Sequence, residues 1–489
     1  MNTSNQPADL TPRRRLLILA ICCLSLLLVG MDVTIVNVAL PAIRTDLHAS
    51  VSGLQWIIDA YTVVLASLLI LSGSTADRLG RRRTFQLGLV LFSVGSLLCG
   101  VAPGLGWLVA FRMLQAVGGS MLNPVAMSII TNVFLDPRER ARAIGVWAGV
   151  VGISLGLGPV LGGVLVEGIG WRSIFWVNVP IGIAAFVLAA LFVPESKAER
   201  ARRIDPLGQV LVIVVLLSLT YAIIEAPRAG GSGEIWAIGA LCVVAFVAFL
   251  VHESRRTDPL IELTFFRSVP FSGATLMAIS AFGAFSAFLF LNTLYLQDVR
   301  GLSALHAGLF LLPMAAMTVL LAPLSGRLVG NRGPRLPLLI AGAALLVGAL
   351  PLTALTDHVG YGWLLGCNLV FGAGFGMVNA PITNTAVSGM PRSQAGVAAA
   401  VASTSRQVGA TLGVAIVGAV VSHGAGAGIR TQFSAATHPG WWIVVGYAAA
   451  VLLLAWLSTG RWAARSAGTV AHLLDEQAPR PDESAMVTR

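Results

Sequence analysis

Long apolar runs, separated by short polar segments rich in arginine, dominate the pattern of hydrophobic and polar positions along the 489-residue chain. A membrane-spanning helix needs about 20 predominantly apolar residues, because the hydrocarbon core is about 30 Å thick and each residue advances a helix by about 1.5 Å. By this criterion the sequence predicts fourteen spanning helices. They cover residues 16–40, 51–72, 84–102, 107–130, 142–165, 173–193, 206–226, 235–251, 271–296, 304–325, 336–356, 361–383, 395–421 and 441–458.

The composition agrees with this pattern. The chain is 56% hydrophobic and only 11% charged, whereas soluble domains carry about 25% charged residues. Its 53 glycines are typical of packed membrane helices, which use small residues where they touch. The sequence therefore excludes a soluble enzyme and a disordered protein, and it predicts an all-α polytopic membrane protein in contact with the lipid bilayer.

The basic residues predict how the helices are oriented. A net charge of +10 would suggest nucleic-acid binding in a soluble domain, but here the charges lie between the spans, so we expect no nucleic-acid partner. If the N-terminus is cytoplasmic, the loops outside hold five arginines: Arg44, Arg172, Arg228, Arg300 and Arg430. Arg112 and Arg406 lie within spans, and every other Lys or Arg falls on the cytoplasmic side, as the positive-inside rule requires. We therefore expect both termini in the cytoplasm.

A repeated segment indicates two related halves. Residues 73–83 follow the second span, and the similar residues 324–335 follow the tenth, an offset of eight spans. Two parallel halves around a midplane site are typical of transporters. The predicted regions are a cytoplasmic tail 1–15, a six-helix half 16–193, a loop with two inserted helices 194–251, a cytoplasmic linker 252–270, a second six-helix half 271–458 and a cytoplasmic, disordered tail 459–489. The linker is either an ordinary loop or a segment lying along the membrane surface.

Three charged residues lie deep in apolar sequence: Asp32, Asp59 and Arg112. A carboxylate at mid-membrane costs about 2.5–3.5 kcal/mol, so each acid needs a partner or a function. Proton exchange, binding of a cationic substrate, or a structural ion pair would each account for the two acids. Arg112 keeps its proton and therefore needs a partner or a water-filled cavity, although an anchoring role near the helix end is an alternative.

Five residues are predicted to line a substrate cavity: Trp56, Tyr61, Gln115, Asn123 and Asn379. Gln115 and Asn123 share a helix face with Arg112, and this polar stripe on an apolar span is typical of a cavity lining. Trp56 lies one helical turn before Asp59, and an aromatic ring beside an acid suits an organic cation. Asn379 belongs to a weaker polar stripe in the span 361–383.

Small residues recur every third or fourth position in the span 142–165: Gly145, Gly149, Gly152, Gly156, Pro159 and Gly163. This spacing places them on one helix face, which allows a neighbouring helix to approach closely. A packing seam is sufficient to explain the pattern. A similar face in the span 395–421 is its expected partner: Ala398, Ala402, Ser405, Gly409 and Gly413.

Five residues of the segment 73–83 are candidates for conformational gating: Gly73, Asp77, Arg78, Gly80 and Arg81. The two glycines suit a tight turn. Asp77 is expected to pair with Arg138 or Arg142 when the protein is closed on the cytoplasmic side, and breaking such a set would permit the other conformation. The alternative is that the arginines only set the topology.

In this order, five segments resemble the major facilitator superfamily, and specifically its fourteen-span drug:proton antiporters of the EmrB/QacA type. The segments are 31–41, 73–83, 112–119, 152–163 and 171–180. The resemblance covers roughly residues 16–460. It implies a major facilitator fold and export of hydrophobic, cationic drugs or antibiotics by alternating access across the bacterial inner membrane.

The resemblance also implies roles for particular residues. It assigns Asp32, Asp59 and Arg112 to proton coupling or, for the acids, to recognition of a cationic drug. It assigns a further set to the antiporter motif that marks exporters: Gly152, Gly156, Gly158, Pro159, Gly162 and Gly163.

No pattern indicates an enzyme or a cofactor. The chain has no Walker sequence, so we expect the proton gradient rather than ATP to drive transport. The five cysteines lie in apolar runs and the seven histidines show no metal-ligand spacing, so we expect no metal. We also expect a monomer. The alternatives are an exporter of a specific endogenous metabolite, siderophore or lipid, and, in another class, a membrane receptor or an intramembrane enzyme.

The gating hypothesis predicts the behaviour of Asp77→Asn. The variant should transport more slowly because the balance between the two conformations is disturbed, while its affinity for the substrate stays close to that of the wild type. Binding to the detergent-purified protein, measured beside transport, tests this. A large fall in affinity with normal conformational cycling would instead place Asp77 in contact with the substrate.

Overall fold

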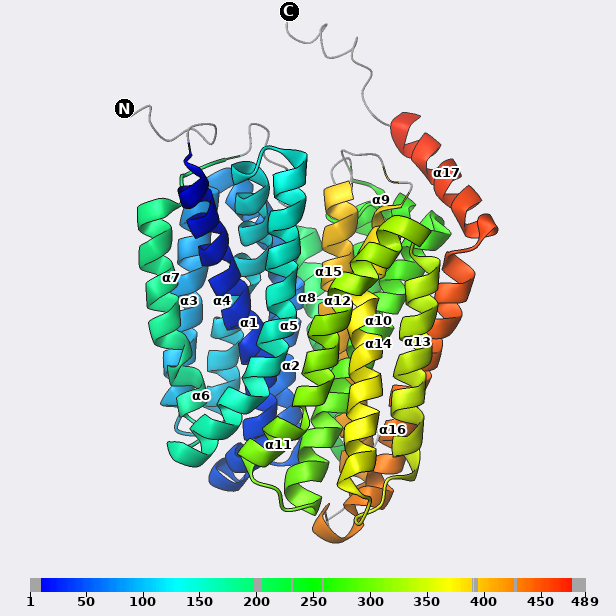
Figure 1. Ribbon diagram of the computed structural model, residues 1–489. Helices are drawn as coiled ribbons and strands as arrows, with labels where there is room; N and C mark the ends of the chain where they lie inside the picture. The colour runs from blue at the N-terminus through cyan, green and yellow to red at the C-terminus, as the bar shows by residue number, and fades with distance from the viewer. Residues whose placement is uncertain are drawn as a thin grey trace, which may run out of the picture.

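The computed structural model describes residues 10–197, 205–229, 232–256, 259–388, 390, 395–425 and 429–476, and over these ranges the chain is a bundle of helices without strands (Figure 1). Fourteen helices are long and apolar enough to cross a membrane. Each of the fourteen predicted spans overlaps one of them. The predicted all-α membrane class and the number of spans are therefore confirmed.

The first half of the bundle contains seven helical segments: α1 (Pro12–Leu47), α2 (Val51–Leu79), α3 (Arg81–Gly100), α4 (Leu105–Val133), α5 (Pro137–Gly168), the short α6 (Ser173–Trp176) and α7 (Asn178–Phe192). Local sequence sets where these helices begin. Asp136 caps α5 by accepting hydrogen bonds from the N–H groups of Arg138 and Glu139, and Pro137 occupies the first turn. α6 and α7 together form one span.

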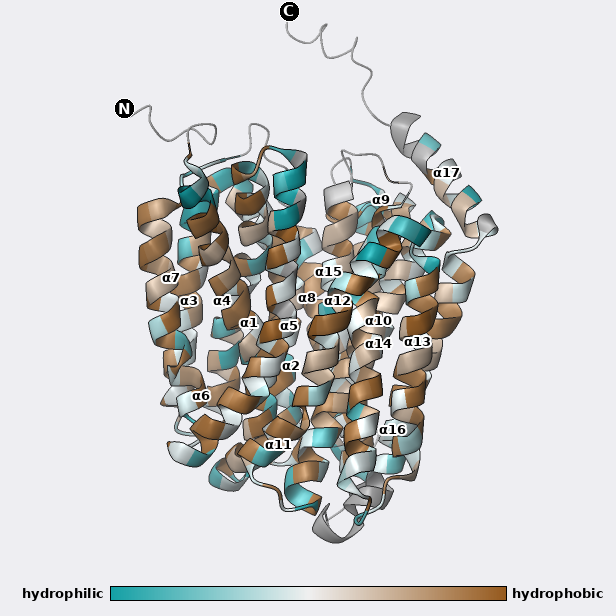
Figure 2. Cartoon of the chain, in the orientation of Figure 1, coloured by the Kyte–Doolittle hydropathy of each residue, from teal (hydrophilic) through white to brown (hydrophobic). Residues whose placement is uncertain are grey.

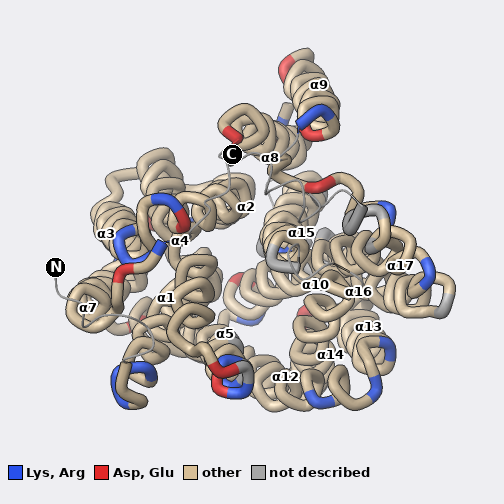
Figure 3. The backbone as a smooth tube through the Cα atoms, turned by 90° about the horizontal axis from the view of Figure 1, so that it is seen from above, with Lys and Arg blue, Asp and Glu red and all other residues tan. Residues whose placement is uncertain are grey.

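The second half contains α10 (Val269–Leu294) with its continuation η3 (Tyr295–Val299), α11 (Ala304–Phe310), α12 (Leu312–Arg332), α13 (Arg335–Ala349) with η4 (Leu350–Ala354), α14 (Tyr361–Val387), α15 (Ala395–Ala425) and α16 (Ile429–Ser458). The inserted pair is α8 (Pro206–Ala229) and α9 (Gly233–Ser254). Seen from above, α8 lies beside α2 and α15, where the two halves meet, and α9 lies outside it (Figure 3).

Hydrophobic residues prevail along the middle of the helices, and hydrophilic residues gather towards the two ends of the bundle (Figure 2). Large side chains such as Val243 in α9 and Leu320 in α12 are exposed, as expected for helices that face lipid. The beginning of α1 and the end of α17 (Arg461–Glu476) lie at the same face (Figure 1), which we call the terminal face. The opposite face is called the distal face.

The two halves are joined by polar contacts near the distal face. Arg44 of α1 forms an ion pair with Asp298 at 2.9 Å, and Gln297 donates to the carbonyl oxygen of Val38 at 2.9 Å. Nearby, Glu167 accepts a hydrogen bond from the N–H of Leu305 at 2.7 Å. The molecule is therefore closed at its distal face.

Towards the terminal face the halves separate. Among the described residues, the polar contact between the halves that lies nearest to the terminal face joins Thr411 of α15 to Thr62, near the middle of α2, at 2.8 Å. Further along α5, a Cβ atom placed on Gly145 or Gly149 would meet no atom within 4 Å. The glycine face of α5 is thus packed at the distal end and unpacked at the terminal end.

Two predictions about the terminal face need correction. The tail from residue 459 was expected to be disordered, but α17 (Arg461–Glu476) is helical, because Ala463, Ala467 and Val470 form one apolar face that is buried. Residues 477–489 of the predicted disordered tail lie outside the described residues. The turn after α2 is also shorter than predicted: Gly80 has a φ of 115°, whereas Gly73 lies within α2.

The linker between α9 and α10 is an ordinary loop with one short turn, η2 (Leu263–Arg267). Phe265 is fully buried, and its ring lies 5.3 Å from that of Phe271 in α10. Because this ring is packed into the protein, the loop is anchored to the second half. This outcome favours the loop over the alternative of a segment lying along the membrane surface.

The packing at the distal face predicts that Gly163→Val disfavours this conformation. A Cβ at Gly163 would overlap Leu305 and lie 2.8 Å from the carbonyl oxygen of Ala304. Overpacking typically costs about 1–3 kcal/mol, which corresponds to a shift of about 5–150-fold towards a conformation in which α5 and α11 separate. Distances between spin labels on the distal ends of the two halves would measure this shift.

Gly168→Ala is the matched control, because its Cβ would meet no atom within 4 Å. If the two variants give the same distance distribution as the wild type, close packing at Gly163 does not hold the distal face closed.

Candidate functional site

Asp32 and Arg112 form a buried ion pair inside the first half. Arg112 Nη1 donates to Asp32 Oδ2 and, at 2.8 Å, to Gln115 Oε1. Gln115 Nε2 in turn donates to Asp32 Oδ1 at 2.8 Å. The three side chains form a closed ring of hydrogen bonds, and at most 1% of each residue is exposed.

Side chains from three other helices complete this network. Asn178, the first residue of α7, donates to Asp32 Oδ1 and to Ser96 Oγ of α3, both at 3.0 Å. Arg112 Nε donates to the carbonyl oxygen of Ile57 in α2, and the guanidinium lies 4.1 Å from the centre of the Tyr61 ring. The network therefore ties α1, α2, α3, α4 and α7 together.

Glycines allow the helices to come close enough for these contacts. A Cβ on Gly95 of α3 would lie 2.6 Å from the backbone nitrogen of Gln115, and one on Gly118 of α4 would overlap the backbone of Phe92. Since the backbones of α3 and α4 touch, Ser96 and Gln115 reach each other at 3.3 Å. Arg112 is the eighth residue of α4, so it lies about 10 Å along the helix from the distal face.

Asp59 differs sharply from Asp32. It is fully buried in α2, about 12 Å along the helix from the distal face, and neither carboxylate oxygen has a hydrogen-bond partner among the described residues. An isolated carboxylate in such surroundings is costly as an anion. In this conformation the Asp59 side chain therefore lacks, among the described residues, a group that would stabilise its anion.

The predicted cavity residues do not form one cavity lining. Gln115 and Tyr61 belong to the buried network. Trp56 instead faces the inserted helix α8: its Nε1 donates to Glu225 at 2.8 Å, and its ring lies 5.9 Å from that of Tyr221. Asn123 of α4 is partly buried, and its side-chain oxygen has no partner in the described part of the chain.

Asn379 belongs to a polar cluster in the second half. It is exposed and accepts a hydrogen bond from Arg406 Nη1 at 2.9 Å, and Arg406 also contacts Thr383 at 3.2 Å. The guanidinium lies 5.9 Å from the ring of Phe282, which in turn packs on Phe375. The sequence analysis used Arg406 only to orient the helices, although an arginine within a span already indicates a functional site.

The predicted gating segment, residues 73–83, is held by Glu195, a residue that was not predicted from the sequence. Asp77 pairs with Arg81 at 3.1 Å, whereas Arg138 and Arg142, the expected partners in the other conformation, are exposed here. Glu195, which follows α7, accepts a hydrogen bond from the backbone N–H of Arg82 at 3.1 Å and lies beside Gly80. It lay in a region read as a loop, so no periodicity singled it out.

The glycines of α5 serve two different faces. Gly152, Gly156 and Gly163 face α12 and α11 of the second half, and the backbone of Pro159 touches Gly308 of α11. Two others, Gly158 and Gly162, face α1 at Thr34 and Ile35. The predicted partner face in α15 is wrong: Gly409 and Gly413 pack on α10 instead.

Two helical halves that meet at one face, with an ion pair buried among the spanning helices of the first half, are typical of a membrane transporter. Comparison with known proteins agrees, since the model of the Major Facilitator Superfamily matches residues 22–414. The chain belongs to this superfamily, and it is a transporter rather than an enzyme.

Two relatives and one solved structure show the extent of the similarity. Multidrug resistance protein Stp of Mycobacterium tuberculosis is 36% identical over 84% of this chain and 76% of its own. The tetracenomycin C resistance and export protein of Streptomyces glaucescens is 38% identical over 81% of this chain and 74% of its own. A bacterial homologue of the human lysosomal transporter Spinster has the same fold, with a TM-score of 0.61 at 17% identity over 96% of this chain and all of its own.

The buried ion pair predicts a non-additive effect on stability. Arg112→Gln leaves the Asp32 carboxylate without its countercharge and should cost about 3–5 kcal/mol. In the double variant Asp32→Asn, Arg112→Gln, two neutral amides replace the charges, so most of this loss should be recovered. Thermal unfolding in detergent, followed by tryptophan fluorescence, measures both effects.

Arg15→Gln is the control, because Arg15 pairs with Glu139 at the terminal surface, where the pair is partly exposed. Such a pair is worth about 0–1 kcal/mol. Equal melting temperatures for Arg112→Gln and the double variant would contradict the expected recovery, and would show that the unpaired Asp32 carboxylate is not what destabilises Arg112→Gln.

Proposed function

We propose that this protein is a proton-coupled antiporter that exports hydrophobic, cationic drugs or antibiotics across the bacterial inner membrane by alternating access. The terminal face would be cytoplasmic, because most arginines lie in the loops and tails that connect the spans on that face. The two relatives described above carry names that refer to multidrug resistance and to export of tetracenomycin C, which supports drugs or an antibiotic as the substrate class. We propose that it acts as a monomer and needs no cofactor.

The observation that carries proton coupling is the contrast between the two buried acids. Asp32 accepts hydrogen bonds from three donors, one of which is its countercharge Arg112. The Asp59 carboxylate has no hydrogen-bond donor among the described residues. A buried carboxyl without donors can be neutralised by a proton or by a cationic substrate, but one site does not hold both at once. Competition of this kind exchanges one cation for another across the membrane.

The geometry supports a cycle with the following roles. In the present conformation, closed at the distal face, substrate would enter from the terminal side, where Asn379 and Arg406 are accessible in the second half. Opening of the distal face requires α5 to leave α11 and α12, and it would expose the region of Asp32 and Asp59 to protons from outside. Arg112 would hold Asp32 in place and adjust its affinity for a proton.

The proposal predicts how export responds to voltage and to pH. One proton moving through 100 mV releases about 2.3 kcal/mol, but a monovalent cation exchanged for one proton moves no net charge. With both acids titrating, two protons exchange for one cation and voltage contributes. Export of a monovalent cation should therefore depend on voltage in the wild type, and Asp59→Asn should lose this dependence while keeping some export driven by the pH difference. Asp32→Asn should abolish or strongly impair gradient-driven export while still reaching the membrane.

Inverted membrane vesicles allow this test, with voltage and pH gradients imposed separately by ionophores and with one cationic and one neutral compound. Asp357→Asn, at an exposed loop position near the distal face, is the control and should export like the wild type. If Asp59 only binds the charge of the cation, Asp59→Asn should spare the neutral compound and leave its voltage dependence unchanged. Wild-type behaviour of Asp59→Asn in all four conditions would remove Asp59 from both roles, and full export by Asp32→Asn would reject the proposal for Asp32.

A further inference from the structure

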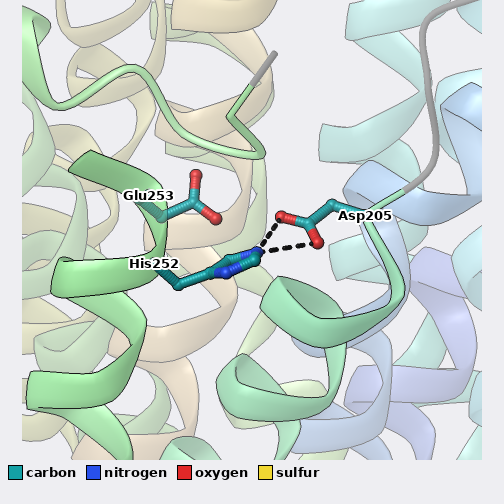
Figure 4. Close-up of side chains that lie close together, drawn as sticks. All are labelled: Asp205, His252 and Glu253. Carbon is teal, nitrogen blue, oxygen red and sulfur yellow. Dashed lines mark hydrogen bonds and ion pairs between the residues drawn. The ribbon is translucent and has the colours of Figure 1, made fainter. Parts of the chain in front are cut away.

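A second cluster of titratable side chains lies apart from the proposed transport site, at the terminal end of the inserted helices. Asp205 immediately precedes α8, and His252 and Glu253 belong to the last turn of α9 (Figure 4). Both acids are buried, with 3% and 2% of the residue exposed. One possible ligand atom from each of the three residues lies within 4.8 Å of the others.

One oxygen of each carboxylate is held by a group outside the three. Asp205 Oδ1 accepts the N–H of Gly208 at 3.0 Å and pairs with Arg256 at 3.1 Å. Glu253 Oε2 accepts the N–H of Ile261 at 2.9 Å. Groups of this kind orient the ligands of metal sites, because they fix the carboxylate and leave its other oxygen available.

The remaining atoms converge. His252 Nε2 lies 3.0 Å from Asp205 Oδ1 and 3.1 Å from Asp205 Oδ2 (Figure 4). Glu253 Oε1 is buried without a hydrogen-bond partner among the described residues. A Cβ on Gly208 would lie 2.7 Å from Glu253 Oε1 and closer still to Asp205 Oδ2. The two oxygens therefore point to the same place beside α8, and the glycine keeps a side chain out of it.

Acidic and basic side chains meet in this cluster. Two buried carboxylates face one arginine and a histidine that is neutral unless protonated. A buried negative charge without a partner is costly.

We propose that Asp205 Oδ2, His252 Nε2 and Glu253 Oε1 bind a divalent transition-metal ion of the Zn²⁺ type. An imidazole nitrogen with two carboxylate oxygens suits Zn²⁺, whereas Ca²⁺ and Mg²⁺ prefer oxygen ligands alone. Three protein ligands leave a fourth tetrahedral position for water. The ion would join the start of α8 to the end of α9, and through Ile261 it would also fix the linker that leads to the second half.

The test uses the purified full-length protein in detergent, with any affinity tag removed and metals stripped by a chelator. Titration with Zn²⁺ alone, followed by calorimetry, should show one ion bound per chain. Substitution by Co²⁺ should give the visible absorption bands of a tetrahedral site. Zn²⁺ should also raise the melting temperature of the wild type, because an ion that binds only the folded state stabilises it.

Asp205→Asn, His252→Gln and Glu253→Gln should each weaken Zn²⁺ binding by at least about tenfold, since even changes outside the ligand shell cost about 10–100-fold. Glu234→Gln, at the other end of the same helix pair, is the matched control and should bind like the wild type. No tetrahedral Co²⁺ spectrum in the wild type, or equal Zn²⁺ affinity in the wild type and Glu253→Gln, would overturn the proposal and leave the two carboxylates sharing a proton. The wild-type spectrum decides the question even if a variant fails to fold.

Discussion

Burying charge within a lipid-facing bundle is costly, and the contact between Asp32 and Arg112 is the arrangement that makes it tolerable here. Either charge alone would be costly in the first half, because both side chains are buried away from solvent. The charge of each side chain is neutralised by the other, and Gln115, Asn178 and Ser96 supply the remaining hydrogen bonds of the network. Five helices must keep their positions to maintain this network, so it constrains the packing of the whole half.

The glycines determine how closely the helices can approach, and in α5 they do so on two sides. Gly158 and Gly162 fix α5 to α1, which carries Asp32, while Gly152, Gly156 and Gly163 form the contact with α11 and α12. The first contact lies within one half, and the second joins the two halves. A change of conformation can therefore break the second contact while the first carries α5 along with the buried network. This arrangement links the state of the distal face to the surroundings of the buried acids.

The two halves differ in their chemistry although they share a fold. The buried ion pair lies in the first half, whereas the second half offers Arg406 with polar partners and a stack of aromatic rings in which Phe285 lies 4.1 Å from Phe375. The inserted helix α8 contacts both halves, through Gln209 to α2 and by packing against α15. It also holds Trp56 through Glu225. The inserted pair is thus placed where the halves meet, close to the α2 segment that carries Asp59.

Much of the fold could be predicted from the sequence, because the length and hydropathy of a spanning helix are set by the membrane rather than by distant contacts. The fourteen spans and the all-α class follow from this constraint. The charged residues Asp32, Asp59 and Arg112 could also be singled out, since any charge inside an apolar run is expensive. The helical part of the tail was missed, because its apolar residues are interspersed with arginines and other polar residues and do not form a continuous apolar run.

The sequence by itself therefore determined which segments enter the membrane and which charges enter with them. Only the tertiary structure decided the partners: Asp32 meets Arg112 and Asn178, while Asp59 meets no donor among the described residues. Asp205, His252 and Glu253 likewise meet only when α8 and α9 fold back on each other. The physical reason is that periodicity places a side chain on a face of its own helix, whereas the helix that covers this face is selected by packing of the whole bundle.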